Sequence, residues 1–122
     1  MEIQNRTGII ELEEMEFFAY HGCYEEEQIK GNKFLVNISV ETNVTKPAET
    51  DCIEDALNYV EVYKLTEQEM KKTSHLLENV AARIIDRLFE DFDSIIHAEV
   101  KVSKLTPRID GLMKKVSLTL KR

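Results

Sequence analysis

The sequence predicts an α+β fold, a four-stranded antiparallel sheet with two helices on one face, in the order strand, strand, helix, helix, strand, strand. Three observations support this prediction. Alternating apolar and polar residues mark the strands, a repeat of apolar residues at spacings of three and four marks one helix, and the helical stretch lies between two pairs of strands. The chain has 122 residues, so we expect a single domain over residues 1–122.

Two strands open the chain. Residues 9–20 are rich in bulky apolar side chains whose alternation is imperfect, which favours a strand interrupted by a bulge. Residues 34–42 alternate plainly, and successive side chains of a strand point to opposite faces. One face of this second strand is therefore predicted to carry Phe34, Val36, Ile38 and Val40.

The middle of the chain is predicted to be helical. Residues 48–59 are mixed, and we interpret them as a loop with an extended end. Asn58 and Glu61 have the spacing of a helix N-cap and its reciprocal partner, which predicts a helix over residues 59–72. A second helix, with Ser74 as its predicted cap, follows from an apolar repeat at Leu77, Ala81, Ile84, Leu88 and Phe92.

Two further strands, residues 98–104 and 114–120, close the chain. Their apolar residues are predicted to face the helices, whereas the other face of the sheet is polar, with Asn37, Ser39, Glu41, Glu99, Lys101, Ser103, Lys115, Ser117 and Thr119. Such a sheet has two free edges. We therefore expect identical subunits to associate edge to edge into a closed ring whose interior is polar.

The composition disfavours several classes of partner. A net charge of −7 has the wrong sign for binding nucleic acid or anionic lipid, and no apolar run approaches the roughly 20 residues that span a bilayer. We expect a cytoplasmic protein that acts on neither. The two cysteines and three histidines show no metal-ligand spacing, so neither a metal nor another cofactor is predicted.

Lys104 is the first candidate for chemistry. It continues the run Val100, Val102, Lys104, so the period of two places it on the apolar face at the end of its strand. A partly buried ammonium loses hydration, which lowers its pKa and allows proton exchange near neutral pH. The alternative is that the strand has already ended and the amine reaches water.

Two more candidates lie at helix starts. Glu78 is in the first turn of the second helix, where the helix dipole favours a carboxylate, and it has no Lys or Arg three or four residues away. It is either a helix-start carboxylate or an acceptor for a ligand. Tyr59 begins the first helix, where its ring either covers a flat ligand or packs in the core.

The stretch YHGCYEEE, residues 20–27, raises a separate question. Gly22 follows Tyr20 and His21, which predicts a positive φ or a close backbone approach at the strand end. The three glutamates that follow are typical of a solvated loop.

Several motifs, in this order and spacing, resemble those of the dihydroneopterin aldolases of the folate pathway. They are YHG at 20–22, Glu27, GNKF at 31–34, TD at 50–51, LNY at 57–59, LLE at 76–78, and Lys104 followed by Pro107 and Gly111. The resemblance extends from about residue 8 to the C-terminus.

The resemblance implies a tunnelling-fold subunit that assembles into a homotetramer or homo-octamer, with active sites between subunits. It implies retro-aldol cleavage of a pterin, 7,8-dihydroneopterin, into 6-hydroxymethyl-7,8-dihydropterin and glycolaldehyde, without a metal or a Schiff base. Lys104 would be the proton donor and acceptor, and Glu27 would hold the hydroxylated side chain of the substrate with it. Tyr59 would stack over the ring and assist proton movement.

The resemblance also implies the residues that bind the pterin ring. Glu78 would accept two N–H bonds from its guanidine-like edge, aided by the backbone of Leu77. The backbone of Leu57 and Asn58 would line the same pocket.

The chain departs from the family after Lys104. Many members have additional prolines where this chain has Arg108 and Asp110, so the loop is predicted to be less rigid.

Two alternative functions therefore stay open. One is an epimerase of dihydroneopterin triphosphate with the same fold, for which basic residues at the pocket mouth are expected. The other is a non-catalytic oligomer that binds pterins or purines.

Overall fold

The computed structural model describes residues 5–107 and 109–122. Its sheet has four antiparallel strands in the order β1-β2-β3-β4. The strands are β1 (Thr7–Ala19), β2 (Asn32–Asn43), β3 (Ile95–Leu105) and β4 (Lys115–Lys121). This confirms the predicted α+β fold and leaves β1 and β4 as the two edges of the sheet.

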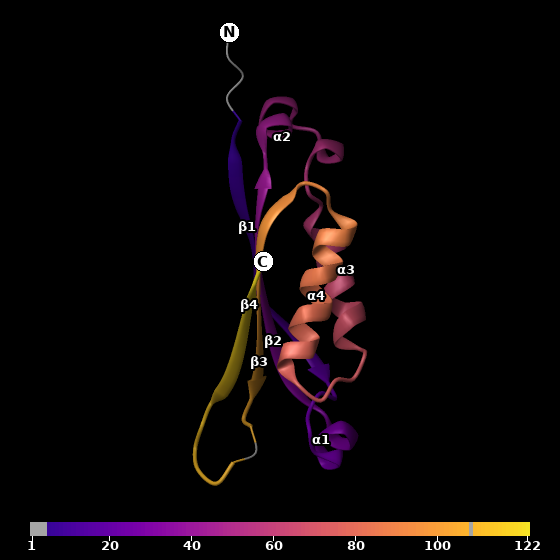
Figure 1. The fold of residues 1–122 in the computed structure, drawn as a ribbon, viewed down its shortest axis with the longest axis vertical. Helices are drawn as coiled ribbons and strands as arrows, with labels where there is room; N and C mark the ends of the chain where they lie inside the picture. The colour runs from indigo at the N-terminus through magenta and orange to yellow at the C-terminus, as the bar shows by residue number, and fades with distance from the viewer. Residues whose placement is uncertain (1–4, 108) are drawn as a thin grey trace.

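Two helices cover one face of the sheet and leave the other open (Figure 1). They are α3 (Tyr59–Met70) and α4 (Leu77–Asp91), which run in opposite directions. The core lies between the helices and the sheet. Its fully buried side chains include Phe34, Val36, Val40, Val62, Val80, Ile84, Leu88, Val100 and Val102.

The predicted bulge in the first strand is present. The pairing of β1 with β2 shifts between Leu12 and Met15. Glu14, inside the shift, has a positive φ of 53°, and its N–H donates to Oδ1 of Asn37 at 2.8 Å. The bulge lets the inward alternation resume at Met15 and Phe17, which are both buried.

Three short helical segments replace predicted loops. They are α1 (Glu25–Lys30), α2 (Thr45–Thr50) and the 3₁₀ turn η1 (Ile53–Asp55). Each is too short to show an apolar repeat in the sequence. Gly31 ends α1, where its N–H donates to the carbonyl of Glu27 at 2.9 Å.

The two predicted helix caps have different outcomes. The side chain of Asn58 accepts the N–H of Val60 at 3.0 Å, which confirms the start of α3. The prediction for Ser74 is wrong, because α4 begins at Leu77 and its N-cap, Leu76, makes no side-chain cap. Ser74 lies in the preceding turn, where its hydroxyl donates to Asn79 at 2.6 Å.

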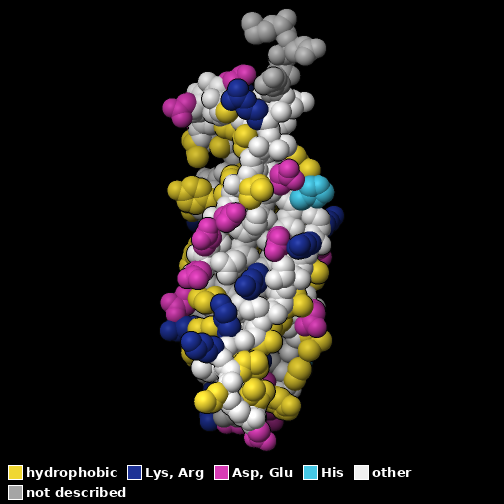
Figure 2. Space-filling model, turned by 90° about the vertical axis from the view of Figure 1, so that its left-hand side faces the viewer, with side chains coloured by type: hydrophobic (Ala, Val, Ile, Leu, Met, Phe, Trp, Pro, Cys, Tyr) yellow, Lys and Arg dark blue, Asp and Glu magenta, His cyan; other side chains and the backbone are white. Residues whose placement is uncertain are grey.

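The uncovered face of the sheet is mixed in character. Figure 2 shows basic and acidic side chains interspersed along it. Ser103 lies on the predicted outward face but is buried there, and it shares a hydrogen bond of 2.7 Å with Ser117 of the neighbouring strand. At the β4 edge, Val116 was predicted to face the core but is 39 % exposed, because the helices cover an edge strand less fully.

None of the helices in the described ranges has both the length and the apolar character needed to traverse a bilayer.

Candidate active site

An ion pair at the end of β3 is the centre of the candidate site. Nζ of Lys104 lies 2.6 Å from Oε2 of Glu27, and the two side chains are only 14 % and 12 % exposed. The residues are 77 positions apart in the chain. A largely dehydrated ammonium–carboxylate pair can donate and accept protons with little reorganisation of water.

Strand alternation places Lys104 as the sequence predicted. It pairs with Phe34 of β2 and lies on the same face as Val100 and Val102, so the alternative of an amine beyond the strand end is wrong. The side chain of Asn32 donates to the carbonyl of Leu105 at 2.6 Å. This bond fixes the last residue of β3 against the start of β2, next to the amine.

Within helix α1, Glu27 faces the sheet, whereas the two preceding glutamates face solvent. Glu25 is exposed, and Glu26 pairs with Lys30 at the surface at 2.7 Å. Glu27 faces inward and uses both oxygens, Oε2 with Lys104 and Oε1 as acceptor of the N–H of Tyr24 at 3.4 Å. Only one of the three charges therefore belongs to the site.

The turn before α4 is tied to the segment before α1. The N–H of Ser74 donates to Nδ1 of His21 at 3.0 Å, and the N–H of Gly22 donates to the carbonyl of Ser74 at 3.0 Å. The Gln28 side chain donates to the carbonyl of Gly22 at 2.8 Å. These bonds bring the first turn of α4 to the end of the molecule that holds Glu27 (Figure 1).

Glu78 lies in that first turn with its side chain exposed. Among the residues that the structure describes, it makes no hydrogen bond or ion pair. The N–H groups of Leu77 and Glu78 have no partner within the helix, because the first turn of any helix lacks them. A carboxylate beside free N–H groups can bind a ligand edge that offers both donors and an acceptor.

His21 is a buried neighbour of the ion pair. It is 1 % exposed and packs edge-on against Phe34, with ring centroids 5.2 Å apart. Burial, with the charge of Arg83 second, lowers the pKa of His21 from 6.5 to about 4. The ring is therefore neutral near neutral pH, and its Nδ1 is the acceptor for Ser74.

A buried charge cluster supports the same turn and was not predicted. Glu69 is 2 % exposed and accepts bonds from Arg83, Arg87 and Lys72 at 2.8 to 3.0 Å. Arg83 also donates to the carbonyls of Glu69 and Lys72 and to the Ser74 hydroxyl, each at 2.8 Å. No local spacing signals this cluster, since its partners lie up to 18 positions apart.

The other predicted site residues lie at the opposite end of the subunit. Helix α3 starts at the end of the subunit where α4 ends (Figure 1). Tyr59 is its first residue and is 61 % exposed. Leu57 is buried, and it lines with Asn58 a cavity of about 430 Å³ bounded by the end of α4. One chain therefore does not bring Tyr59 together with Lys104, Glu27 and Glu78.

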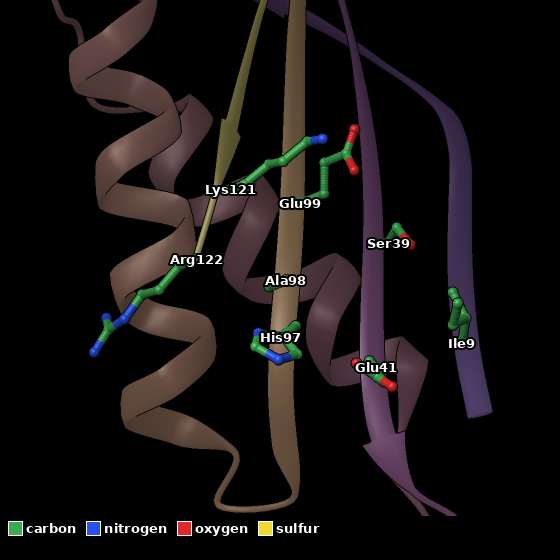
Figure 3. Close-up of a pocket in the computed structure, with 8 residues that line it drawn as sticks. All are labelled: Ile9, Ser39, Glu41, His97, Ala98, Glu99, Lys121 and Arg122. Atoms are coloured by element: carbon green, nitrogen blue, oxygen red, sulfur yellow. The ribbon is translucent and has the colours of Figure 1, made fainter. Parts of the chain in front are cut away.

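A separate hollow of about 380 Å³ lies on the open face of the sheet (Figure 3). Its side chains come from all four strands and include Ser39, Glu41, His97 and Glu99. His97 precedes Lys104 by seven strand residues, which corresponds to about 23 Å. The hollow is therefore not part of the candidate site.

Of the two residues that replace family prolines after Lys104, Arg108 lies outside the described residues. Asp110 is exposed. No group of three or more His, Cys, Asp or Glu suited to a metal ion occurs within residues 5–107 and 109–122.

The fold defines a class of α+β protein known from solved structures. The Escherichia coli dihydroneopterin aldolase in complex with neopterin superposes with a TM-score of 0.86 at 22% identity, over 94% of this chain and 98% of that chain. A Burkholderia dihydroneopterin aldolase bound to guanine superposes with a TM-score of 0.78 at 16% identity, over 95% and 90% of the two chains.

Sequence comparison identifies the family. The sequence model of the dihydroneopterin aldolase family matches residues 10–121 of this chain. The dihydroneopterin aldolase of Bacillus subtilis is 33% identical over 112 residues, which cover 91% of this chain and 93% of the relative. The chain therefore belongs to the dihydroneopterin aldolase family.

Proposed function

We propose that this protein cleaves 7,8-dihydroneopterin into 6-hydroxymethyl-7,8-dihydropterin and glycolaldehyde, as a carbon–carbon lyase of folate biosynthesis. The observation that supports this most directly is the shielded pair of Lys104 and Glu27, 2.6 Å apart, in a chain of this family. The proposal includes a cytoplasmic location and one catalytic domain over residues 1–122.

Glu78 is proposed to recognise the amino-pyrimidinone edge of the pterin. A carboxylate accepts two parallel N–H bonds from the amino group and the adjacent ring nitrogen, and such charge-assisted pairs are about twice as strong as neutral ones. The backbone N–H of Leu77 is free to serve the neighbouring ring acceptor. The neopterin and guanine complexes of the two structural relatives carry this same edge in their ligands.

The proposed chemistry needs only proton transfers. The hydroxyl on the leaving carbon of the scissile bond loses its proton, the carbon–carbon bond breaks, and that carbon becomes the aldehyde of the departing glycolaldehyde. The released electron pair moves into the ring C=N bond, whose nitrogen takes up a proton. Return of a proton to the side-chain carbon, with loss of the proton on nitrogen, gives the hydroxymethyl product.

Lys104 is proposed to exchange the proton at the ring nitrogen through water, and Glu27 to hold the hydroxylated side chain with it. Lysine acts as an acid and base, because the ring already supplies the electron acceptor that a Schiff base would otherwise provide. The short Lys104–Glu27 bond supports this assignment, since it holds the amine in one orientation.

The site is proposed to be completed by a neighbouring subunit. Tyr59, Leu57 and Asn58 lie at the far end of the same chain, and Tyr59 exposes most of its ring. In a homotetramer or homo-octamer closed through the β1 and β4 edges, this end can meet Lys104 and Glu78 of the next subunit. Tyr59 would then stack over the pterin and assist proton movement.

One assay tests the activity. Purified protein is incubated with 7,8-dihydroneopterin and a chelator, and both products are measured. We expect 6-hydroxymethyl-7,8-dihydropterin and glycolaldehyde in equal amounts. Preference for dihydroneopterin triphosphate, with inversion at the side chain and little glycolaldehyde, would identify an epimerase instead.

A variant separates catalysis from binding. Lys104→Ala is expected to bind pterin with nearly unchanged affinity while turnover falls by about 10²–10⁴-fold, because the acid–base group is lost. If the wild-type protein bound pterin without releasing glycolaldehyde, it would be a binding protein.

A further inference from the structure

We propose that Gly22 is a positioning residue for Glu27: its missing side chain leaves the space into which the Glu27 carboxylate folds to reach Lys104. The inference concerns how this chain builds its acid–base pair. Its importance for turnover rests on the proposed function, whereas its effect on the pair itself does not.

The contact between the two residues is unusually close. A Cβ at Gly22 would lie 2.6 Å from Cδ, 2.7 Å from Cβ and 2.7 Å from Oε1 of Glu27. All three distances are below the 3.0 Å that real Cβ atoms essentially never undercut. The clash involves both the root and the tip of the side chain, so a rotation of the carboxylate alone does not relieve it.

The backbone around Gly22 is tied to the turn before α4. Its N–H donates to the carbonyl of Ser74, and the preceding His21 is buried and accepts the N–H of Ser74. The carbonyl of Gly22 accepts the side chain of Gln28, which belongs to α1 itself. Ser74 is held in turn by Arg83, which belongs to the buried cluster around Glu69. The glycine is therefore anchored to the core, and α1 is the partner with less support.

Helix α1 has only six residues and none of them is buried. Glu27 connects it to the sheet through Lys104 and closes its first turn through the N–H of Tyr24. An added methyl group at Gly22 is expected to push Glu27 and the first turn of α1 outward. That movement lengthens or breaks the 2.6 Å bond to Lys104.

The first test measures the ion pair directly and needs no substrate. A double-mutant cycle of Glu27→Gln and Lys104→Met is run by chemical denaturation, once in the wild-type background and once with Gly22→Ala. We expect a non-additive shift of the denaturation midpoint in the wild-type background and none with Gly22→Ala. An equal non-additive shift in both backgrounds would overturn the proposal.

The matched control is Gly8→Ala. A Cβ at Gly8 would meet only the side chain of Val44, at 3.1 Å, far from the pair in the sequence and in the sheet. This variant is expected to leave the Glu27–Lys104 coupling unchanged. Loss of the coupling with Gly8→Ala as well would show that any strained glycine has the same effect, and would count against a specific role for Gly22.

The second test uses the cleavage assay. Gly22→Ala is expected to lower kcat/KM on the order of 100-fold, the scale of a misplacement by about 1 Å. In a Glu27→Gln background the same change is expected to cost less than about twofold, because the group it displaces is already inactive. A full loss in both backgrounds would mean that Gly22 acts through general folding.

The outcomes of the two tests distinguish a failure of the proposed function from a failure of the positioning inference. If the wild-type protein does not cleave dihydroneopterin, the proposed function is wrong, and the denaturation cycle still decides whether Gly22 positions Glu27. If cleavage occurs but the coupling persists with Gly22→Ala, the positioning inference alone is wrong.

Discussion

Glu25, Glu26 and Glu27 are consecutive, yet their surroundings differ completely. Glu27 is the member of the trio that faces the sheet, where Lys104 and Gly22 enclose it. Glu25 and Glu26 lie on the solvent side of α1. A helix rotates successive side chains by about 100°, so one residue of three faces inward.

Changing each glutamate to Gln tests this difference. Glu27→Gln is expected to lower turnover by about 10²–10⁴-fold, because it removes the charged partner of Lys104. Glu25→Gln and Glu26→Gln are expected to change it by less than about threefold. Steady-state kinetics on 7,8-dihydroneopterin provide the measurement, and similar small losses at all three positions would contradict the assignment.

His21 makes the stability of the subunit depend on pH. Its pKa is about 4 in the folded protein and 6.5 in the unfolded chain, so below pH 6.5 the unfolded chain binds the proton first. Stability is therefore highest above pH 6.5 and falls as the pH drops toward 4. Between pH 7 and pH 5 the expected loss is about 2 kcal/mol per subunit.

Denaturation midpoints measured between pH 7 and pH 5 check this expectation. The lower limit of pH 5 avoids the titration of Glu69, whose contribution to stability is lost only as the pH falls below its unfolded pKa of 4.5. His21→Gln is expected to flatten the pH dependence, and the exposed His97→Gln is expected to keep it. A pH dependence that survives in His21→Gln would assign the titration to another group.

At the scale of elements, the turn between α3 and α4 depends on one buried carboxylate. Burial alone would raise the pKa of Glu69, but the bonds from Arg83, Arg87 and Lys72 outweigh it and hold the pKa below its ordinary value. Arg83 also donates to the hydroxyl of Ser74, and the carbonyl of Ser74 holds Gly22 in the segment before α1. The cluster thus connects helix packing to the geometry of the site.

Glu69→Gln is expected to destabilise the fold by about 3 kcal/mol, because it removes a buried charge and leaves two partly buried guanidinium groups without their counter-charge. Glu16→Gln provides the matched control. It removes a pair of similar length, 2.8 Å to Lys33, whose two side chains are more than half exposed, and should cost less than about 1 kcal/mol. Equal costs in urea denaturation would show that the buried cluster adds nothing beyond a surface pair.

At the scale of the whole molecule, the proposed site needs residues from more than one chain. The proposed acid–base and recognition groups Lys104, Glu27 and Glu78 lie where β3 ends and α4 begins. Tyr59 begins α3, whose first turn lies at the other end of the subunit (Figure 1). The unpaired edges β1 and β4 offer the surfaces through which a ring can close.

Mixing two inactive variants tests the shared site. In a hybrid oligomer built from Tyr59→Ala subunits and Lys104→Ala subunits, some interfaces combine an intact Lys104 from one subunit with an intact Tyr59 from another. Part of the activity is therefore expected to return. Co-expression with two affinity tags isolates the hybrids, and each variant alone is the control. Absence of any recovery in hybrids of confirmed composition would place the whole site within one chain.

The sequence determined the strands, the two long helices, the bulge and the place of Lys104. These follow from local rules, since the alternation of β3 alone puts Lys104 on the face of Val100 and Val102. The start of α3 at Asn58 was likewise local. The family motifs then identified Glu27, which no periodicity distinguishes from Glu25 and Glu26.

Only the tertiary structure decided what surrounds these residues. The bond between Lys104 and Glu27 joins segments that are distant in the chain. The close approach of Gly22 to Glu27 and the bond from Arg83 to Ser74 depend on the exact path of a loop. Local patterns report on which face a side chain lies. Which atoms meet on that face depends on how separate elements pack, and packing is set by the whole fold.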